Sequence, residues 1–239
     1  MMKPFIFGHR GAMAYEPENT LLSVKKAIDF GVDGIEVDVR KCKSSEIVVI
    51  HDERVNRTTN GKGYVKDFNL KNLKKLDAGK GEKIPTLMEI IEVIKIFNKK
   101  NKKQIKLIIE LKEKDLGKDV VNLIKKFKFI NNVIIISFYH QLIKNIKKLS
   151  KKINAGILFV GNPINAASLA KDANAGYLFA NFNYIDSDLV QNAHQNKLKV
   201  FVWNIDDIKN LKKMLKLNVD GIGSNKPDVI VDYFKKRRF

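Results

Sequence analysis

The chain has 239 residues, of which 44% are hydrophobic, and its formal net charge is +19 at pH 7. This length suits one α/β barrel of ~250 residues, and the apolar fraction excludes a globally disordered chain. The positive charge favours anionic partners such as phosphates, nucleic acid or acidic lipid. The chain is rich in lysine, isoleucine and asparagine, which share A/T-rich codons. Genome composition can therefore account for much of the positive charge, and we expect no specific nucleic-acid binding.

Cysteine usage and the N-terminal residues bear on the compartment. Cys42 is the single cysteine, which excludes an internal disulfide and a cysteine-based metal site. The apolar stretch in MMKPFIFGHRG is too short for a signal peptide, and no run of 18 apolar residues predicts a transmembrane helix. These features predict a cytoplasmic protein and leave its oligomeric state open.

Short β-rich runs alternate with helix-like stretches along the chain. Most runs are continuously apolar, as expected of parallel strands buried on both faces. The predicted strands are 5–8, 34–39, 47–50, 106–111, 133–138, 155–160, 176–180, 200–203 and 221–224. The predicted helices are 20–31, 86–100, 119–129, 140–150, 187–197 and 207–218. This alternation predicts a (β/α)8 TIM barrel formed by residues 1–239 as one domain. The loop-rich residues at about 52–85 are predicted to be a small insertion after the second strand region.

One connection is too short for a parallel crossover. Only RKCKSSE, residues 40–46, separates the second and third predicted strands, so these strands should form an antiparallel hairpin. With Ser44 and Ser45 as a two-residue turn, His51 would lie opposite Asp38. The hairpin is therefore expected to bring a histidine to the acids of the preceding strand.

Three acids lie within apolar strands. Glu36 and Asp38 are two residues apart, which places both side chains on one face of a strand, and Glu110 lies in a separate strand. Buried carboxylates are costly unless a cation or a proton neutralises them. An oxygen-only ligand set suits one divalent cation, Mg²⁺ or Ca²⁺. The alternative is a set of structural ion pairs with Lys112 and Arg10.

Two histidines end apolar strands, and each is followed by a charged residue. His9 and His51 suit a general acid–base pair, because imidazole titrates near neutral pH. Arg10 offers a planar donor fork suited to phosphate, or it pairs with Glu18. The remaining histidines fall in helical stretches and are interpreted as surface or packing residues: His140 and His194.

A series of motifs extends over nearly the whole chain: HRG with PENT, GIEVDV, VVIHD, RTTNGKGYV, LDAGKG, IPTLMEII, LIIELK, SF, VFVWNI and VDGIGSNKPD. In order and spacing this set resembles the glycerophosphodiester phosphodiesterases, which are similar to the phosphoinositide phospholipase C-like barrels. The resemblance implies a TIM barrel that uses a divalent cation to hydrolyse glycerophosphodiesters to glycerol 3-phosphate and an alcohol.

The resemblance also implies roles for single residues. The metal ligands would be Glu36, Asp38 and Glu110, and the acid–base residues His9 and His51. By analogy with the bacterial phosphoinositide phospholipases, His9 would be the base and His51 the acid, with water or the glycerol 2-hydroxyl as nucleophile. The remaining implied contacts are with phosphate, by Arg10 and Lys112, and with glycerol, by Trp203.

The chain departs from the family pattern at two places. Tyr139 follows SF where an acid is common, and Ser224-Asn225 stand where Thr-Asp is usual. We expect the second change to leave that part of the barrel rim more positive, and neither change to contact the acids or the histidines.

Other functions are compatible with parts of the sequence. Lys112 at a strand end could form a Schiff base in an aldolase or a phosphosugar isomerase. The basic-aromatic tail DYFKKRRF, 232–239, could make weak contact with a membrane surface in a binding protein without turnover, although a solvated helix is the simpler interpretation. A lysophospholipase D acting on lysophospholipids is a further alternative, which would need an apolar groove on the barrel rim.

Overall fold

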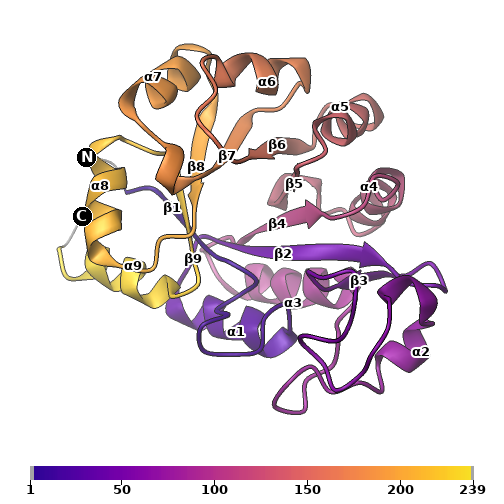
Figure 1. The fold of residues 1–239 in the computed structure, drawn as a ribbon. Coiled ribbons are helices and arrows are strands. Elements are labelled where there is room, and N and C mark those ends of the chain that lie inside the picture. The colour runs from indigo at the N-terminus through magenta and orange to yellow at the C-terminus, as the bar shows by residue number, and fades with distance from the viewer. Residues whose placement is uncertain (1–2, 238–239) are drawn as a thin grey trace.

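The computed structural model describes residues 3–237, in which eight parallel strands close into a barrel (Figure 1). Neighbouring strands follow the order β1-β9-β8-β7-β6-β5-β4-β2, and β1 also pairs with β2, which closes the barrel. The strands of the sheet are β1 (Phe5–Gly8), β2 (Gly34–Lys41), β3 (Ile47–Val49), β4 (Lys106–Leu111), β5 (Val133–Ser137), β6 (Asn154–Phe159), β7 (Tyr177–Asn181), β8 (Lys199–Trp203) and β9 (Gly221–Ser224). The predicted TIM barrel is confirmed, with β3 as an extra strand on the edge of β2.

Helices surround the barrel, and α1, α3, α6, α7 and α8 begin at polar residues whose side chains accept from a backbone N–H of the first turn. Thr20 accepts a hydrogen bond from the backbone N–H of Ser23 at 3.2 Å, and Gly31 ends the same helix with φ +87°. The α-helices are α1 (Leu21–Phe30), α2 (Leu70–Leu73), α3 (Leu87–Lys100), α4 (Gly117–Lys126), α5 (His140–Leu149), α6 (Ala166–Asp172), α7 (Ser187–Gln195), α8 (Ile208–Lys216) and α9 (Pro227–Lys235). Among the described residues, none of these helices has the length and apolar character needed to cross a membrane.

Alternation along the strands separates two apolar layers. On β2, Ile35, Val37 and Val39 belong to the large layer between strands and helices. The barrel interior holds a separate cluster: Phe7, Ile108, Ile134, Ile136, Leu158, Phe179 and Phe201. Because side chains alternate with period two, Glu36 and Asp38 point into the barrel with this second cluster.

The hairpin of β2 and β3 forms as predicted, but its register differs by one residue. Val39 pairs with Val49 and Lys41 with Ile47, so Asp38 lies opposite Ile50 rather than His51. The turn has three residues instead of two, because Ser45 adopts the left-handed conformation, with φ +73°. His51 therefore lies beyond the end of β3, in the loop that follows it.

Residues 52–85 lie beside the hairpin and contain little regular structure beyond η1 (Val65–Asp67) and α2 (Figure 1). Their apolar side chains pack with the outer side of the hairpin in a small third cluster: Cys42, Val48, Ile50, Val55, Val65, Leu73, Ala78 and Ile84. This packing fixes the segment against the hairpin that leads to His51. The division of the chain into domains stays a prediction.

The C-terminal helix α9 accounts for part of the basic-aromatic tail. Phe234 is buried in the large apolar layer, and Tyr233 packs against that layer. The tail is therefore not a free aromatic surface over the residues that the structure describes, and residues 238–239 of the predicted membrane contact lie outside them.

Candidate active site

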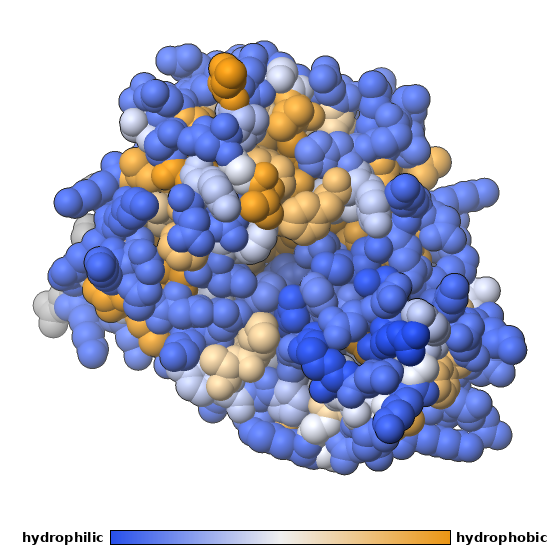
Figure 2. All heavy atoms as spheres, viewed as in Figure 1, coloured by the Kyte–Doolittle hydropathy of each residue, from blue (hydrophilic) through white to orange (hydrophobic). Residues whose placement is uncertain are grey.

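The predicted site residues converge at the carboxyl ends of the barrel strands. A cavity of about 300 Å³ there is lined by seven of the eight, namely His9, Arg10, Glu36, His51, Glu110, Lys112 and Trp203. Asp38 is fully buried beside them. Figure 2 shows a hollow at the centre of this face, with apolar residues gathered along its upper edge and hydrophilic residues over most of the remaining surface.

The three acids form one compact cluster. Asp38 and Glu110 are direct neighbours in the pairing of β2 with β4, and Glu36 lies one inward position before Asp38. One carboxylate oxygen from each residue lies within 4.8 Å of the others. All three side chains are buried, so the cluster concentrates negative charge where water cannot screen it.

Burial and mutual repulsion separate the pKa values of these acids. Burial, Asp38 and Glu110 together raise the pKa of Glu36 well above its ordinary value. Burial and the nearby Asp38 raise the pKa of Glu110 to about 7. Burial also acts to raise the pKa of Asp38, but Lys112 and Arg10 outweigh it and lower that pKa. These shifts favour the protonated forms of Glu36 and Glu110 and the charged form of Asp38.

Two cations contact the acids, as the alternative interpretation of ion pairs requires. The Lys112 Nζ lies 2.6 Å from Glu110 Oε1 and 3.4 Å from Asp38 Oδ1. The Arg10 Nη1 lies 2.8 Å from Glu18 Oε1, and its Nε lies 3.2 Å from Asp38 Oδ2. Glu18 is thus a partner of Arg10, and both cations remain within reach of an anion bound at the cavity.

The donor set fits a divalent cation in spite of these ion pairs. Among the described residues, Glu36 Oε1 and Asp38 Oδ1 are buried without a hydrogen bond, and Asp38 Oδ1 has only the ion-pair contact with Lys112 at 3.4 Å. Buried carboxylate oxygens without donors are costly, and a hard cation would satisfy them. The acid cluster Glu36, Asp38 and Glu110 could therefore bind a metal ion.

The PENT motif contributes a residue that the sequence did not single out. Asn19 donates from Nδ2 to Asp38 Oδ2 at 2.9 Å and accepts from the Asp38 backbone N–H at 3.2 Å. Its own backbone N–H donates to the Arg10 carbonyl at 3.0 Å. The loop after β1 therefore holds one of the acids in place, which explains why an asparagine stands in the middle of that motif.

The turn after β1 positions His9 and Arg10. Arg10 has φ +51°, and its backbone N–H donates to Glu36 Oε2 at 2.9 Å. Gly11 follows with φ +84°, and a Cβ atom there would lie 2.4 Å from Ser23 Oγ. Only glycine fits this combination of backbone conformation and close approach, which accounts for the HRG sequence.

His9 is largely buried and has a neutral partner. Its Nδ1 lies 2.7 Å from Asn225 Oδ1, and Asn225 Nδ2 donates to Asp206 Oδ2 at 2.7 Å. Asp206 fixes the Asn225 amide with its oxygen toward the ring, and this shorter contact favours a hydrogen on Nδ1, although Asn204 Nδ2 also lies 3.2 Å from the same atom. The Nε2 atom is then an acceptor and lies 3.9 Å from Glu36 Oε2. Burial and the positive charge of Arg10 lower the pKa of His9 to about 4.

The expectation about Ser224 and Asn225 was wrong on one point. Asn225 contacts His9, so this departure does reach the histidine pair. The rim also retains an acid at this place, because Asp206 accepts from Ser224 Oγ at 2.9 Å and from the Asn225 backbone N–H at 2.7 Å. Asp206 comes from the loop after β8, which the spacing of residues 224 and 225 could not indicate.

His51 is only half buried and has a charged partner. Its Nδ1 lies 2.7 Å from Asp52 Oδ1, and Arg57 donates to both Asp52 oxygens at 2.7 and 3.0 Å. The Arg40 Nε donates to the His51 carbonyl at 2.9 Å, which fixes the loop to β2. Burial lowers the pKa of His51, against the opposing effects of Asp38 and Asp52.

Apolar and aromatic side chains form the other wall of the cavity. Trp203 at the end of β8 packs edge-on against Phe138, with ring centroids 6.3 Å apart. Among the described residues, the buried Trp203 Nε1 has no hydrogen-bond partner and is available to a ligand. The other two histidines have structural contacts, since His140 bonds the Leu158 carbonyl and His194 bonds Asp220.

Comparisons with known proteins agree on one family. Residues 9–229 match the model of the glycerophosphoryl diester phosphodiesterase family. The chain is 37% identical to a glycerophosphodiester phosphodiesterase of Caldanaerobacter subterraneus subsp. tengcongensis, over 98% of this chain and 99% of the relative.

Solved structures show the same architecture. An Oleispira antarctica phosphodiesterase, in complex with the product sn-glycerol-3-phosphate, superposes with a TM-score of 0.87 at 26% identity, covering 97% of each chain. A glycerophosphodiester phosphodiesterase from Thermotoga maritima gives a TM-score of 0.83 at 26% identity, covering 98% of this chain and 99% of that one. The chain therefore belongs to the glycerophosphoryl diester phosphodiesterase family and is an enzyme with glycerophosphodiester phosphodiesterase activity.

Proposed function

We propose that the enzyme hydrolyses glycerophosphodiesters to glycerol 3-phosphate and an alcohol, with a divalent cation and two histidines. The observation that carries this proposal is one buried acid cluster flanked by His9 and His51, whose ring partners differ in charge. The product bound to the Oleispira antarctica relative supports the identity of the released phosphate.

Glu36, Asp38 and Glu110 would hold one Mg²⁺ or Ca²⁺ ion. When bound, this ion would neutralise negative charge on the phosphodiester, which otherwise repels a nucleophile. The raised pKa values of Glu36 and Glu110 support this assignment, because a cation can replace the proton that the cluster otherwise retains.

His9 is the proposed general base and His51 the proposed general acid. A neutral His9 with its hydrogen on Nδ1 presents a lone pair at Nε2, which can accept a proton from the attacking hydroxyl. Asp52 beside His51 counteracts the lowering of the His51 pKa by burial, and a protonated His51 can donate to the departing alcohol oxygen.

The substrate would be held by residues on both sides of the acids. Arg10 and Lys112 supply positive charge for the phosphoryl oxygens. Trp203 and Phe138 offer an aromatic wall for the carbon face of glycerol, and the free indole N–H can bond a glycerol hydroxyl.

The test is a product-release assay with glycerophosphocholine, glycerophosphoethanolamine and glycerophosphoglycerol. Turnover should stop after exhaustive chelation and return with Mg²⁺ or Ca²⁺. Glu36→Ala, Asp38→Ala and Glu110→Ala should each lower kcat by several orders of magnitude, because each removes a ligand from the same cluster. Full turnover in the chelated wild-type enzyme would overturn the metal assignment.

A second candidate, lysophospholipase D activity, is favoured by exposed apolar side chains that follow β5 and β6. Phe138, Val160 and Ile164 are 45%, 57% and 105% exposed, and the carboxyl ends of these parallel strands face the same side as the site. Such residues could contact an acyl chain. Release of choline from lysophosphatidylcholine faster than from glycerophosphocholine would make lysophospholipids the preferred substrates.

A further inference from the structure

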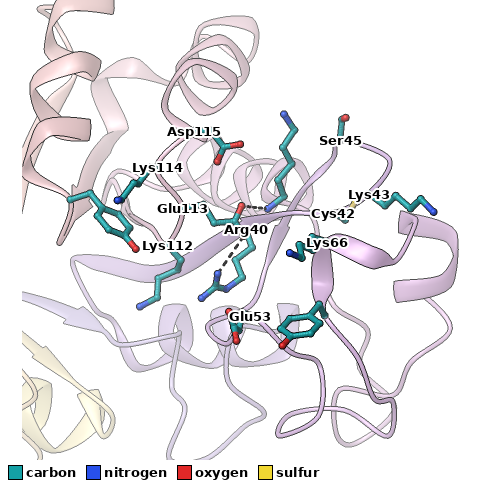
Figure 3. A pocket seen from close by; sticks show the side chains of 13 residues that line it. Arg40, Cys42, Lys43, Ser45, Glu53, Lys66, Lys112, Glu113, Lys114 and Asp115 are labelled. Carbon is teal, nitrogen blue, oxygen red and sulfur yellow. Dashed lines mark hydrogen bonds and ion pairs between the residues drawn. The ribbon is translucent and has the colours of Figure 1, made fainter.

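A second and larger cavity adjoins the candidate active site. It has a volume of about 810 Å³ and lies between the β2–β3 hairpin, residues 112–115 after β4, and residues 64–66 (Figure 3). Lys112 lines both this cavity and the smaller one that contains the acids and histidines. We call the larger cavity the hairpin groove.

Basic side chains dominate the hairpin groove. Six lysine or arginine residues line it, against three acids. One of these acids, Glu113, is already paired with Arg40 at 3.3 Å. Within residues 3–237, Lys66 and Lys114 have no acid at ion-pair distance, and Figure 3 shows them on opposite sides of the groove. Lys41 is paired with Asp119 and Lys112 with Glu110, so among the described lining residues the unpaired positive charge of the groove comes from Lys43, Lys66 and Lys114, against Glu53 and Asp115.

Aromatic rings hold these two lysines at the groove. The Lys66 Nζ lies 5.6 Å from the centre of the Tyr64 ring, and the Lys114 Nζ lies 5.3 Å from that of Tyr139. Cation–π contacts of this kind orient an ammonium group without removing its charge. Both lysines thus remain able to bind an anion.

The position of the groove relates it to the leaving alcohol. Trp203 and Phe138, where glycerol is proposed to bind, line the small cavity but not the hairpin groove. His51 is connected to the hairpin by the bond from Arg40, and Lys112 stands where the two cavities meet. An alcohol that takes its proton from His51 would leave the phosphate toward the hairpin groove.

We propose that the hairpin groove binds a phosphate group carried by the leaving alcohol. The preferred substrates would be glycerophosphodiesters of phosphorylated alcohols, in which a second phosphate lies beyond the one that is cleaved. This inference rests on the proposed function, since it assigns the leaving-group side of the same site. Lys66 and Lys114 would contact the second phosphate, and Lys112 would remain with the first.

The test compares glycerophosphoinositol phosphate with glycerophosphoinositol, which differ by one phosphate on the leaving alcohol. In the wild-type enzyme, kcat/KM should be roughly 10-fold higher for the phosphorylated substrate, and the difference should shrink as salt screens the charges. The double variant Lys66→Gln/Lys114→Gln should lose this preference while retaining its kcat/KM for glycerophosphocholine.

A matched control keeps the same change in net charge. The double variant Lys212→Gln/Lys216→Gln alters two exposed lysines on α8, far from the hairpin in Figure 1, and should retain the wild-type preference. A wild-type enzyme without the preference, or equal effects of the two double variants, would overturn the assignment of the groove. Absence of turnover with every glycerophosphodiester, glycerophosphocholine included, would instead overturn the proposed function.

Discussion

His9 and His51 line the same cavity as two of the acids, and their surroundings differ in two respects. The His9 side chain is 17% exposed and bonds a neutral amide, whereas the His51 side chain is 32% exposed and bonds a carboxylate. Burial lowers the pKa of both rings, but at His51 the carboxylate partner opposes this effect, whereas the neutral partner of His9 is not charged. The two rings are therefore suited to opposite directions of proton transfer, His9 to accepting a proton and His51 to donating one.

Removal of His9 should have the largest effect. His9→Ala removes the proposed base, and every substrate needs its nucleophile activated, so kcat/KM should fall by ~10²–10⁴-fold on both glycerophosphocholine and a nitrophenyl phosphodiester. Steady-state kinetics on both substrates, with thermal unfolding to confirm that the variant is folded, would measure this. A variant that keeps full activity on the nitrophenyl ester would mean that His9 is the acid and not the base.

The partner of His51 should matter less than His51 itself. Asp52→Asn removes the carboxylate that favours the imidazolium, and should lower kcat on glycerophosphocholine by roughly 10-fold to 100-fold, a part of the total for general acid catalysis. The nitrophenyl ester should be nearly unaffected, since its phenolate leaves without a proton. An equal loss on both substrates would show that Asp52 supports the structure of the loop instead.

Exchanging the partner of His9 for a carboxylate should have the smallest effect on activity. It also compares the two histidines most directly, because both would then bond a carboxylate. In the double variant Asp206→Asn/Asn225→Asp, the amide and the carboxylate trade places and their mutual hydrogen bond is kept. His9 then bonds a carboxylate, as His51 does, and its pKa should rise by about one unit.

The direction of the shift in the pH profile follows from the role of His9 as a base. His9 must be neutral to accept a proton, so a higher pKa moves the acidic limb of the kcat/KM profile to higher pH by the same amount, and the plateau above it changes little. The profile should be recorded for the wild-type enzyme and the double variant at one metal concentration. A shift of the limb to lower pH would contradict the assignment of His9.

Much of the fold could be predicted because buried parallel strands have a simple pattern. Runs such as KLIIEL are apolar on both faces, and each predicted strand of this kind lies within two residues of an observed one. The short helix α6 was not predicted, because its sequence AASLAKD has few large apolar residues to show a helical period. The hairpin register was wrong by one residue, since nothing in Ser44-Ser45 indicates that Ser45 takes a left-handed conformation.

The candidate site, like the fold, could be predicted only in part. The inward acids follow from the two-residue period of β2 and β4, and the structure places all eight predicted residues together. The partners of His9 could not be predicted. Asn225 lies 216 positions from His9 in the chain, and Asp206, which bonds Asn225, comes from another loop. Such contacts depend on barrel closure and leave no spacing signal in the sequence.

The role of His51 can be measured most directly through the leaving group. His51→Ala should lose ~10²–10⁴-fold in kcat on glycerophosphocholine, the usual range for general acid catalysis, and progressively less as the pKa of the leaving alcohol falls, with little loss on the nitrophenyl ester. A series of glycerol phosphodiesters with alcohols of graded pKa would give this dependence for the wild-type enzyme and the variant. A steeper dependence on alcohol pKa in the variant is the result that the account predicts. An equal loss for every alcohol would contradict it, and would leave His51 as a phosphate-binding residue.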